Sequence, residues 1–323
     1  MINQKFGLLG YWSLANNNLG DYVQAIAARQ FLPAVDIYCE REKLKSYNGN
    51  EIRMIMNGWF MHNPKNFPPS DKITPIYISM HINSTVYNDM TNEECIVHFK
   101  KYEPIGCRDI NTERLLAKKG IKSYFSGCLT LTLGRLYQRN HVKEHIVIVD
   151  PLYNLFSYKQ VLRYPALLKR IYREKRFKEL NYKNRTLTKF LDPYLLKNAE
   201  FLTQDVRVKS IEEGLKKADA FLKKLCEAKL VITSRIHCAL PCLAMGTPVI
   251  FINAEAPKGN DEFTCRFSGL LEMLNVITVS QTGGFTFNFE CPAKITESNI
   301  PQNKSLHVPY IEKLVEQCIA IAS

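Results

Sequence analysis

The chain has 323 residues, of which 46% are hydrophobic and 23% charged, and this is the composition of a globular protein long enough for two domains. Its formal net charge of +12 points to an anionic partner, which is a nucleic acid, a membrane surface or an acidic substrate. The sequence has neither a zinc-finger spacing nor the aromatic signature of an RNA-binding domain, which disfavours nucleic acid, and no apolar run is long enough to span a membrane.

The ten cysteines are scattered along the chain without any Cys-x-x-Cys pair. Free thiols in a chain of this length fit a reducing compartment, so we expect a cytoplasmic protein. Cys238 and Cys242 lie four residues apart beside His237, but small buried packing residues are favoured over metal ligands there. The residues therefore demand no metal and no other cofactor, although a divalent ion remains compatible with an anionic substrate.

The first part of the chain repeats one pattern, in which a short apolar strand ends in polar or glycine residues. Alternation of such strands with helices predicts an open parallel sheet, where ligands bind at the carboxyl ends of the strands. The predicted strands are residues 6–9, 54–56, 76–80, 105–107 and 124–125, and the predicted helices are residues 21–31 and 112–119. The polar side chains that follow these strands are candidates for binding: Asn18, Asp21, Asn57, His81, Arg108, Asp109 and Ser126.

Each of these candidates also has a structural interpretation. Asp21 and Asp109 lie where helices begin and can act as N-caps, and Arg108 can pair with a neighbouring carboxylate. Gly20 and Asp21 stand together where a polar loop meets a helix, and Asn and Asp side chains in such loops suit sugar hydroxyls. The shared sheet edge is the stronger argument for one site.

A second set of elements begins with residues 145–149, HIVIV, a predicted buried strand. We place the domain boundary in the polar, basic segment 137–144. This gives an N-terminal domain of residues 1–140, a C-terminal domain of residues 141–303, and a closing C-terminal helix within residues 304–323.

Residues 159–190 are strongly basic with helical periodicity, and aromatic residues lie between the basic ones. A solvated helical face explains this pattern, and so does a peripheral surface for anionic lipid headgroups or a charged polymer. Nucleic acid is the third and least favoured partner for this segment.

The most informative stretch is residues 228–253. A short β-branched strand at residues 230–233 leads into Ser-Arg-Ile-His, then into a small apolar helix stopped by Gly246 and a second buried strand. Arg235 and His237 thus lie beside a helix N-terminus, which favours an anion. Arginine offers a fixed fork for phosphate or carboxylate, and histidine moves protons near neutral pH. The alternative is that Arg235 pairs with a structural carboxylate and His237 is a satisfied interior histidine.

The order of these motifs resembles the polysaccharide pyruvyl transferase family. The Ser-Arg-Ile-His element followed by Gly-Thr-Pro-Val-Ile is its most specific part, and the resemblance covers most of the chain. The matching segments are NNNLGD at 16–21, GCRD at 106–109, SGCLTLTL at 126–133, VITSRIHCALPCLAMGTPVIFI at 231–252, and a predicted helix over 266–274 that starts at Arg266. The sequence departs from the family at residues 57–60, where the family has a glycine-rich turn, and at Arg266, where the family often has lysine.

The resemblance implies a fold like the GT-B glycosyltransferases, with two facing Rossmann-like domains and a cleft between them. It implies transfer of the enolpyruvyl unit of phosphoenolpyruvate, as a cyclic ketal with release of phosphate, onto a sugar of a surface polysaccharide or its lipid-linked precursor. The implied donor-binding residues are Ser234, Arg235, Ile236, His237, Arg266 and Ser126. The expected acceptor-binding residues are Asn18, Gly20, Asp21, Asn57, His81, Arg108 and Asp109.

Within this set, His237 is the expected proton shuttle, Arg235 binds the donor anion, and Asp21 or Asp109 is the expected base. A lipid-linked acceptor would bring the protein to the inner face of the membrane. Two alternatives remain: a GT-B glycosyltransferase that uses a nucleotide sugar, and a non-catalytic module that binds an anionic glycan or lipid through residues 159–190. The first alternative needs an acidic nucleotide-binding residue after the central motif, and Glu255 is a poor candidate for it.

Overall fold

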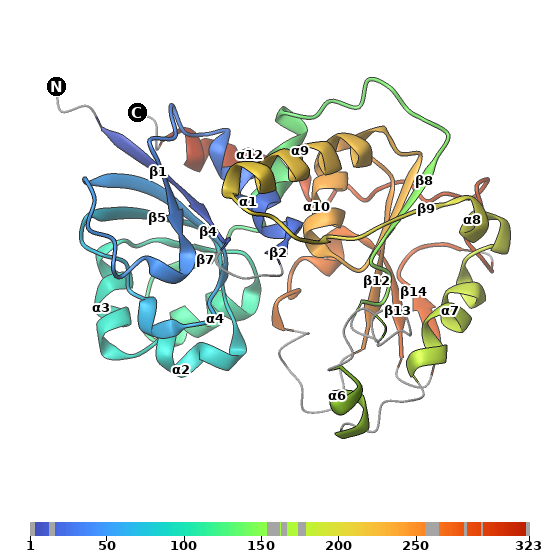
Figure 1. The fold of residues 1–323 in the computed structure, drawn as a ribbon, viewed down its shortest axis with the longest axis horizontal. Helices are drawn as coiled ribbons and strands as arrows, with labels where there is room; N and C mark the ends of the chain where they lie inside the picture. The colour runs from blue at the N-terminus through green and yellow to red at the C-terminus, as the bar shows by residue number, and fades with distance from the viewer. Residues whose placement is uncertain are drawn as a thin grey trace.

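The computed structural model describes residues 4–320 apart from residues 13–16, 154–161, 163–166, 174–178, 256–264, 281–282 and 292. Figure 1 shows an α/β protein in two halves that lie side by side, each built around one sheet. This confirms the predicted two-part α/β organisation with mostly parallel sheets. The predicted domain limits at 140/141 and 303/304 stay predictions.

The first sheet is entirely parallel, with strand order β3-β1-β4-β5-β6-β7. Its strands are β1 (Lys5–Gly10), β3 (Ile37–Glu40), β4 (Ile52–Phe60), β5 (Ile73–Ile82), β6 (Ile105–Cys107) and β7 (Ser123–Phe125). The helices of this half are α1 (Leu19–Arg29), α2 (Tyr87–Met90), α3 (Glu93–Lys101) and α4 (Ile110–Lys118), with 3-10 turns η1 (Arg41–Lys43), η2 (Pro64–Asn66), η3 (Ser84–Val86) and η4 (Leu129–Arg135). Its strands are apolar along most of their length because helices and turns bury both faces.

The second sheet has the order β14-β13-β12-β11-β8-β9 and is parallel except for β14. Its strands are β8 (Ile146–Val149), β9 (Glu200–Leu202), β11 (Leu230–Thr233), β12 (Val249–Ala254), β13 (Asn275–Val279) and β14 (Phe285–Phe287). The helices that follow residue 160 are α6 (Leu167–Arg173), α7 (Glu179–Phe190), α8 (Pro193–Asn198), α9 (Ile211–Glu227), α10 (Ile236–Met245) and α12 (Val308–Ile319), with 3-10 turn η5 (Leu271–Met273). The central motif thus forms β11, α10 and β12, as predicted.

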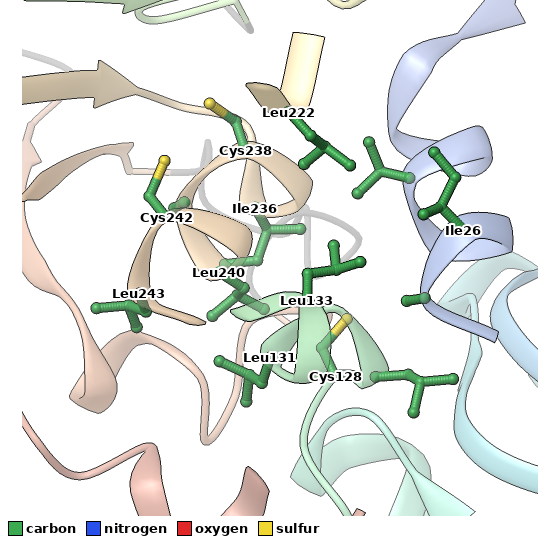
Figure 2. Close-up of a cluster of buried hydrophobic side chains, with 14 of the residues drawn as sticks. Ile26, Cys128, Leu131, Leu133, Leu222, Ile236, Cys238, Leu240, Cys242 and Leu243 are labelled. Carbon is green, nitrogen blue, oxygen red and sulfur yellow. The ribbon is translucent and has the colours of Figure 1, made fainter. Parts of the chain in front are cut away.

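The two halves share one hydrophobic core instead of meeting across a polar surface. Figure 2 shows Ile26 of α1 in one cluster with Leu222 of α9, Leu133 of η4 and Ile236 of α10. Buried residues from β1, α1 and η4 belong to the same cluster as buried residues from α9 and α10. Burial of this apolar surface holds the halves against each other.

Two connections also cross between the halves. The short strand β2 (Asn17–Asn18) pairs antiparallel with β10 (Asp205–Val206), so a loop of the first half completes a two-stranded sheet with the second. The last helix, α12, returns to the first half, where the ring of Tyr310 contacts Phe125 at 5.3 Å between centroids. The predicted closing helix therefore exists, within the narrower bounds Val308–Ile319.

The predicted helix over 266–274 is wrong. Residues 266–270 form turns, and Gly269 has a φ of +85°, which an α-helix does not accommodate. Only η5 (Leu271–Met273) is helical in this stretch.

The basic segment 159–190 falls partly outside the described residues, including Lys159, Arg163, Lys175, Arg176 and Lys178. Within the described part, α6 and α7 are helical as the periodicity predicted, and the side chain of Tyr172 is exposed. Among the described helices, none combines the length and apolarity that crossing a membrane requires.

Candidate active site

A cleft of about 310 Å³ lies between the two halves, and both contribute to its walls. The first half contributes side chains from the ends of β1, β4 and β6 and from the start of α1, and the second contributes the start of α10 and the loop after β8. The lining residues are Tyr11, Asn18, Asp21, Arg41, Trp59, His62, Arg108, Tyr153, Gln204, Arg235, Ile236, His237 and Arg266. The carboxyl edges of two open sheets thus face one cavity, where such folds bind ligands.

Arg235 is the N-cap residue of α10, in an extended conformation and without a side-chain cap. Its guanidinium donates to Asp150 through Nε at 2.9 Å and to Asp205 through Nη2 at 2.8 Å. It also stacks over the ring of Tyr153 at 4.1 Å. Burial opposes its charge, but Asp150 and Asp205 outweigh burial and raise the pKa of Arg235. This arginine is therefore fixed in orientation by two carboxylates, as the structural alternative had it, while it lines the cleft.

His237 and Arg108 meet at the buried end of the cleft. Nη1 of Arg108 lies 3.4 Å from Nε2 of His237, and because a guanidinium only donates, Nε2 is the acceptor. Burial, together with the charges of Arg108 and Arg266, holds the pKa of His237 well below 6.5. His237 is therefore neutral near pH 7 and carries its ring proton on Nδ1.

Arg108 is the largest fully buried side chain of the first half, with an exposed fraction of 2%. Burial lowers its pKa, and among the described residues no carboxylate lies within ion-pair distance of it. Its Nε has no hydrogen-bond partner within the described part of the chain. A buried guanidinium with spare donors is costly unless an anion satisfies it, so Arg108 marks a position for one.

Gly20 allows α1 to approach His237 closely. A Cβ at position 20 would lie 3.0 Å from Nδ1 and 3.2 Å from Cβ of His237. Asn18, the N-cap of α1, accepts a hydrogen bond from the amide of Gly20 at 3.1 Å. The Asn-Leu-Gly-Asp sequence therefore places a helix N-terminus of the first half directly against the histidine of the second.

Asp21 lies in the first turn of α1 and accepts a hydrogen bond from Nη1 of Arg41 at 3.2 Å. Arg41 is itself buried, donates to Glu42 at 3.2 Å, and lies over the rings of Tyr11 and Trp59. Asp21 is thus a paired carboxylate at the edge of the cleft.

Arg266 enters the cleft from the turn that replaces the predicted helix. Its Nη2 donates to the hydroxyl of Tyr153, and its guanidinium stacks on the ring of Phe267 at 4.6 Å. The positive charge expected at this position is therefore present near His237.

Five of the candidate side chains lie outside the cleft lining and make internal hydrogen bonds. Asn57 donates to the carbonyl of Gln24 at 3.0 Å, and Ser126 accepts from the amide of Ser79 at 3.1 Å. Ser234 bridges the carbonyl of Ile252 at 2.6 Å and the amide of Leu152 at 2.8 Å. The last two, His81 and Asp109, form a separate pair. Direct substrate contacts by these five side chains stay predictions.

His81 and Asp109 form a fully buried pair beside Arg108. Nδ1 of His81 donates to Asp109 at 2.6 Å, and Asp109 also caps α4 through the amide of Thr112 at 2.9 Å. Burial and the charge of Arg108 lower the pKa of His81 to about 4 despite the contact with Asp109. Although burial alone would raise it, the contacts with His81, Arg108 and Thr112 lower the pKa of Asp109. The pair is therefore a neutral imidazole on a carboxylate that positions the strand end carrying Arg108.

Several cleft residues were not singled out from the sequence: Tyr11, Arg41, Trp59, His62, Tyr153 and Gln204. Tyr11 follows the carboxyl end of β1 by one residue, and this position at a strand end was a signal for it in the sequence. Arg41 lies in a 3-10 turn after an edge strand that the apolar pattern did not reveal. Among the described residues, no group of His, Cys, Asp and Glu is arranged to hold a metal ion.

The fold and the cleft define a two-part α/β protein with an arginine-rich site between its halves. The chain belongs to the polysaccharide pyruvyl transferase family, whose sequence profile matches residues 18–255. That match confirms the resemblance drawn from the motifs and, at the level of the family, a transferase of polysaccharide biosynthesis. A search among curated proteins found no significant match. The structure is similar to that of a functionally uncharacterized protein from Klebsiella pneumoniae, with 13% identity and a TM-score of 0.42 over 81% of this chain and 87% of that one.

Proposed function

We propose that this protein transfers the enolpyruvyl unit of phosphoenolpyruvate onto a sugar as a cyclic ketal and releases phosphate. The observation that carries the proposal is the buried Arg108 guanidinium, which has spare donors and lies 3.4 Å from the neutral imidazole of His237. A small donor with two anionic groups supplies what this arrangement lacks, and membership of the family supports that donor class.

Phosphoenolpyruvate carries a carboxylate and a phosphate, so it needs cations on more than one side. Arg108 and Arg266 approach from the two halves, and Arg235 is held rigid by Asp150 and Asp205. The uncapped N-terminus of α10 adds backbone N–H groups at Ile236 and His237 that are available to an anion. Fixed donors of this kind bind the ground state and stabilise charge as phosphate departs.

The reaction moves two hydroxyl protons. One sugar hydroxyl bonds to C2 of the donor while C3 gains a proton and becomes a methyl group. The C2–O bond to phosphate then breaks, and a second hydroxyl of the same sugar closes the ketal at C2. Of the two hydroxyl protons, one ends on C3 and the other on the released phosphate, so the atoms and charges balance.

His237 is the proposed proton carrier in this sequence. Because it is neutral in the free protein, it first takes up a proton from solution as the donor binds and gives it either to C3 or to the leaving phosphate. The second hydroxyl restores a proton to His237 as the ketal closes. Asp21 is the proposed base for the attacking hydroxyl, since its carboxylate lines the same cleft beside Arg41.

We expect the acceptor to be a sugar of a surface polysaccharide or of its lipid-linked precursor, met at the inner face of the membrane. The exposed parts of α6 and α7 are the proposed contact with anionic lipid. Cosedimentation with vesicles that contain phosphatidylglycerol, compared with pure phosphatidylcholine vesicles, tests this contact; equal binding to both would exclude it.

The test of the donor is thermal unfolding of the wild type and of Arg108→Met with phosphoenolpyruvate, UDP or GDP. A ligand specific for the folded state stabilises it by ~2.7 kcal/mol at about a hundred times its dissociation constant. We expect stabilisation by phosphoenolpyruvate in the wild type and in the control Arg53→Met, which changes an arginine of β4 outside the cleft lining, but not in Arg108→Met. Stabilisation by a nucleotide alone would favour the glycosyltransferase function.

A further inference from the structure

We propose that the aromatic side chains Tyr11, Trp59 and His62 form a platform that binds the pyranose ring of the acceptor sugar. The three rings come from the ends of β1 and β4 and lie at the first-half side of the cleft. The ring centroid of His62 lies 4.5 Å from that of Trp59 and 5.4 Å from that of Tyr11. This assignment rests on the proposed function and gives the acceptor a location within it.

The platform is held in place by Arg41, which lines the same cleft. The guanidinium of Arg41 is 4.2 Å from the centroid of Tyr11 and 5.2 Å from that of Trp59, so it binds both rings by cation–π contacts. Glu42 fixes the following loop by accepting hydrogen bonds from the amides of His62 at 3.2 Å and Asn63 at 2.9 Å. The rings therefore keep their positions without a ligand, which lowers the entropic cost of binding one.

Exposure determines which rings meet a ligand. Tyr11 is buried, Trp59 is half-buried and His62 is exposed, so the accessible surface of the platform is that of Trp59 and His62. A pyranose has a flat face of C–H groups and a rim of hydroxyls. An aromatic face covers the former, and neighbouring polar groups bind the latter.

The two ends of the cleft differ in their charged side chains, and this difference indicates which ligand binds at each end. At the platform, Asp21 and Glu42 face one guanidinium, that of Arg41, and no cation is left in excess. At the other end, Asp150 and Asp205 both pair with Arg235, whereas Arg108 has no carboxylate within ion-pair distance among the described residues, because the neighbouring Asp109 is bound to His81. The anionic donor belongs at the second end, and a neutral molecule rich in hydroxyls belongs at the platform, with Asp21 between them.

The chain contains two tryptophans, Trp12 and Trp59, so Trp12→Phe leaves Trp59 as the sole indole reporter. Trp12 does not line the cleft. In Trp12→Phe, we would titrate methyl β-D-galactopyranoside, methyl α-D-mannopyranoside, methyl β-D-glucopyranoside and, as an open-chain control, sorbitol. We expect at least one pyranoside, but not sorbitol, to give a saturable change in Trp59 emission. His62→Ala in the same background should weaken that binding about tenfold, the factor that corresponds to ~1.4 kcal/mol.

The donor is followed in parallel by thermal unfolding of Trp12→Phe with phosphoenolpyruvate. If phosphoenolpyruvate stabilises the protein but no pyranoside changes the emission of Trp59, the platform proposal is overturned and the donor site stands. If a pyranoside binds and phosphoenolpyruvate does not, the proposed function fails while the sugar site stands. A saturable change with uridine in place of a sugar would overturn the platform as a pyranose site, because it would assign the rings to a nucleotide base.

Discussion

His237 is neutral because it is buried and because it lies beside charges that a donor would cancel. Burial and the neighbouring guanidinium groups of Arg108 and Arg266 keep its pKa well below 6.5 in the free protein. An anion bound between the same arginines offsets their field and raises the pKa of the imidazole. The donor would therefore bring the histidine into the pKa range in which it can carry a proton.

We therefore expect phosphoenolpyruvate binding to be accompanied by proton uptake near pH 6.5. Isothermal titration calorimetry in buffers of different ionisation enthalpy measures the number taken up. His237→Gln keeps an acceptor for Arg108 but cannot titrate, so we expect its proton uptake to be smaller than that of the wild type. Equal uptake in both proteins would show that His237 does not change its protonation state.

The close contact between Gly20 and His237 leads to a second prediction, on the effect of a substitution at position 20. Replacing glycine by alanine in a helix ordinarily stabilises it by ~0.5–1 kcal/mol. Here the new Cβ would lie 3.0 Å from Nδ1 of His237, so the imidazole must move. We expect Gly20→Ala to lower kcat, measured by phosphate release. Expressed as a free energy, this loss should be at least as large as the change in the free energy of unfolding measured in urea. A more stable variant with unchanged kcat would contradict the role of this close contact.

At the scale of elements, two asparagine helix caps allow an effect on stability to be distinguished from an effect on substrate binding. Asn18 caps α1 through the amide of Gly20 and also lines the cleft, whereas Asn92 caps α3 through the amide of Cys95 at 2.9 Å and does not line it. Loss of an asparagine cap costs ~1 kcal/mol. We expect Asn18→Ala and Asn92→Ala to lower the free energy of unfolding similarly in urea, but only Asn18→Ala to raise the KM of a substrate. A substantial KM increase in Asn92→Ala would indicate a general loss of order.

The sequence revealed the elements whose pattern is local. Strands such as β11 and β12 are short apolar runs because both faces are buried, and the polar residues after them identified Arg235 and His237. The partners of Arg235 were not predictable in this way. Asp150 precedes it by 85 residues and Asp205 by 30, and both reach it only through the order of strands in the second sheet.

The platform side of the cleft shows the same limit. Strand β4 was predicted to end at residue 56, where the apolar run gives way to polar and glycine residues, yet β4 continues to Phe60. Its register with β5 shifts after Met56 because β5 carries an extra residue between Tyr77 and Met80. That continuation carries Trp59 into the cleft. A single-strand pattern cannot show a bulge, since it depends on the register with β5.

At the scale of the whole molecule, the buried His81 and the half-buried His98 make stability depend on pH. The pKa values of His81 and His98 are lowered to about 4, in both cases mainly by burial, while the unfolded chain titrates near 6.5. Below pH 6.5 the unfolded state therefore binds more protons than the folded state, so the free energy of unfolding decreases as the pH is lowered. A fully buried group with such a shift contributes ~2–3 kcal/mol across this window.

We expect the midpoint of urea unfolding to fall continuously as the pH is lowered from 6.5 towards 4. His98→Gln removes one of these groups while it retains a hydrogen-bonding partner for the hydroxyl of Tyr77, which lies 2.7 Å from Nε2 of His98. Its unfolding midpoint should depend less steeply on pH than that of the wild type. An unchanged slope would mean that His98 does not contribute to the acid sensitivity.

The return of α12 to the first half has a consequence for how the protein is made. Leu129, Leu131 and Leu133 of η4 are fully buried, and they share one core with Leu314 and Cys318 of α12. During synthesis, the ribosome finishes η4 long before it adds Val308–Ile319. Until the last helix emerges, the nascent first half lacks part of its apolar cover, so we expect it to depend on chaperones that shield such surfaces during translation.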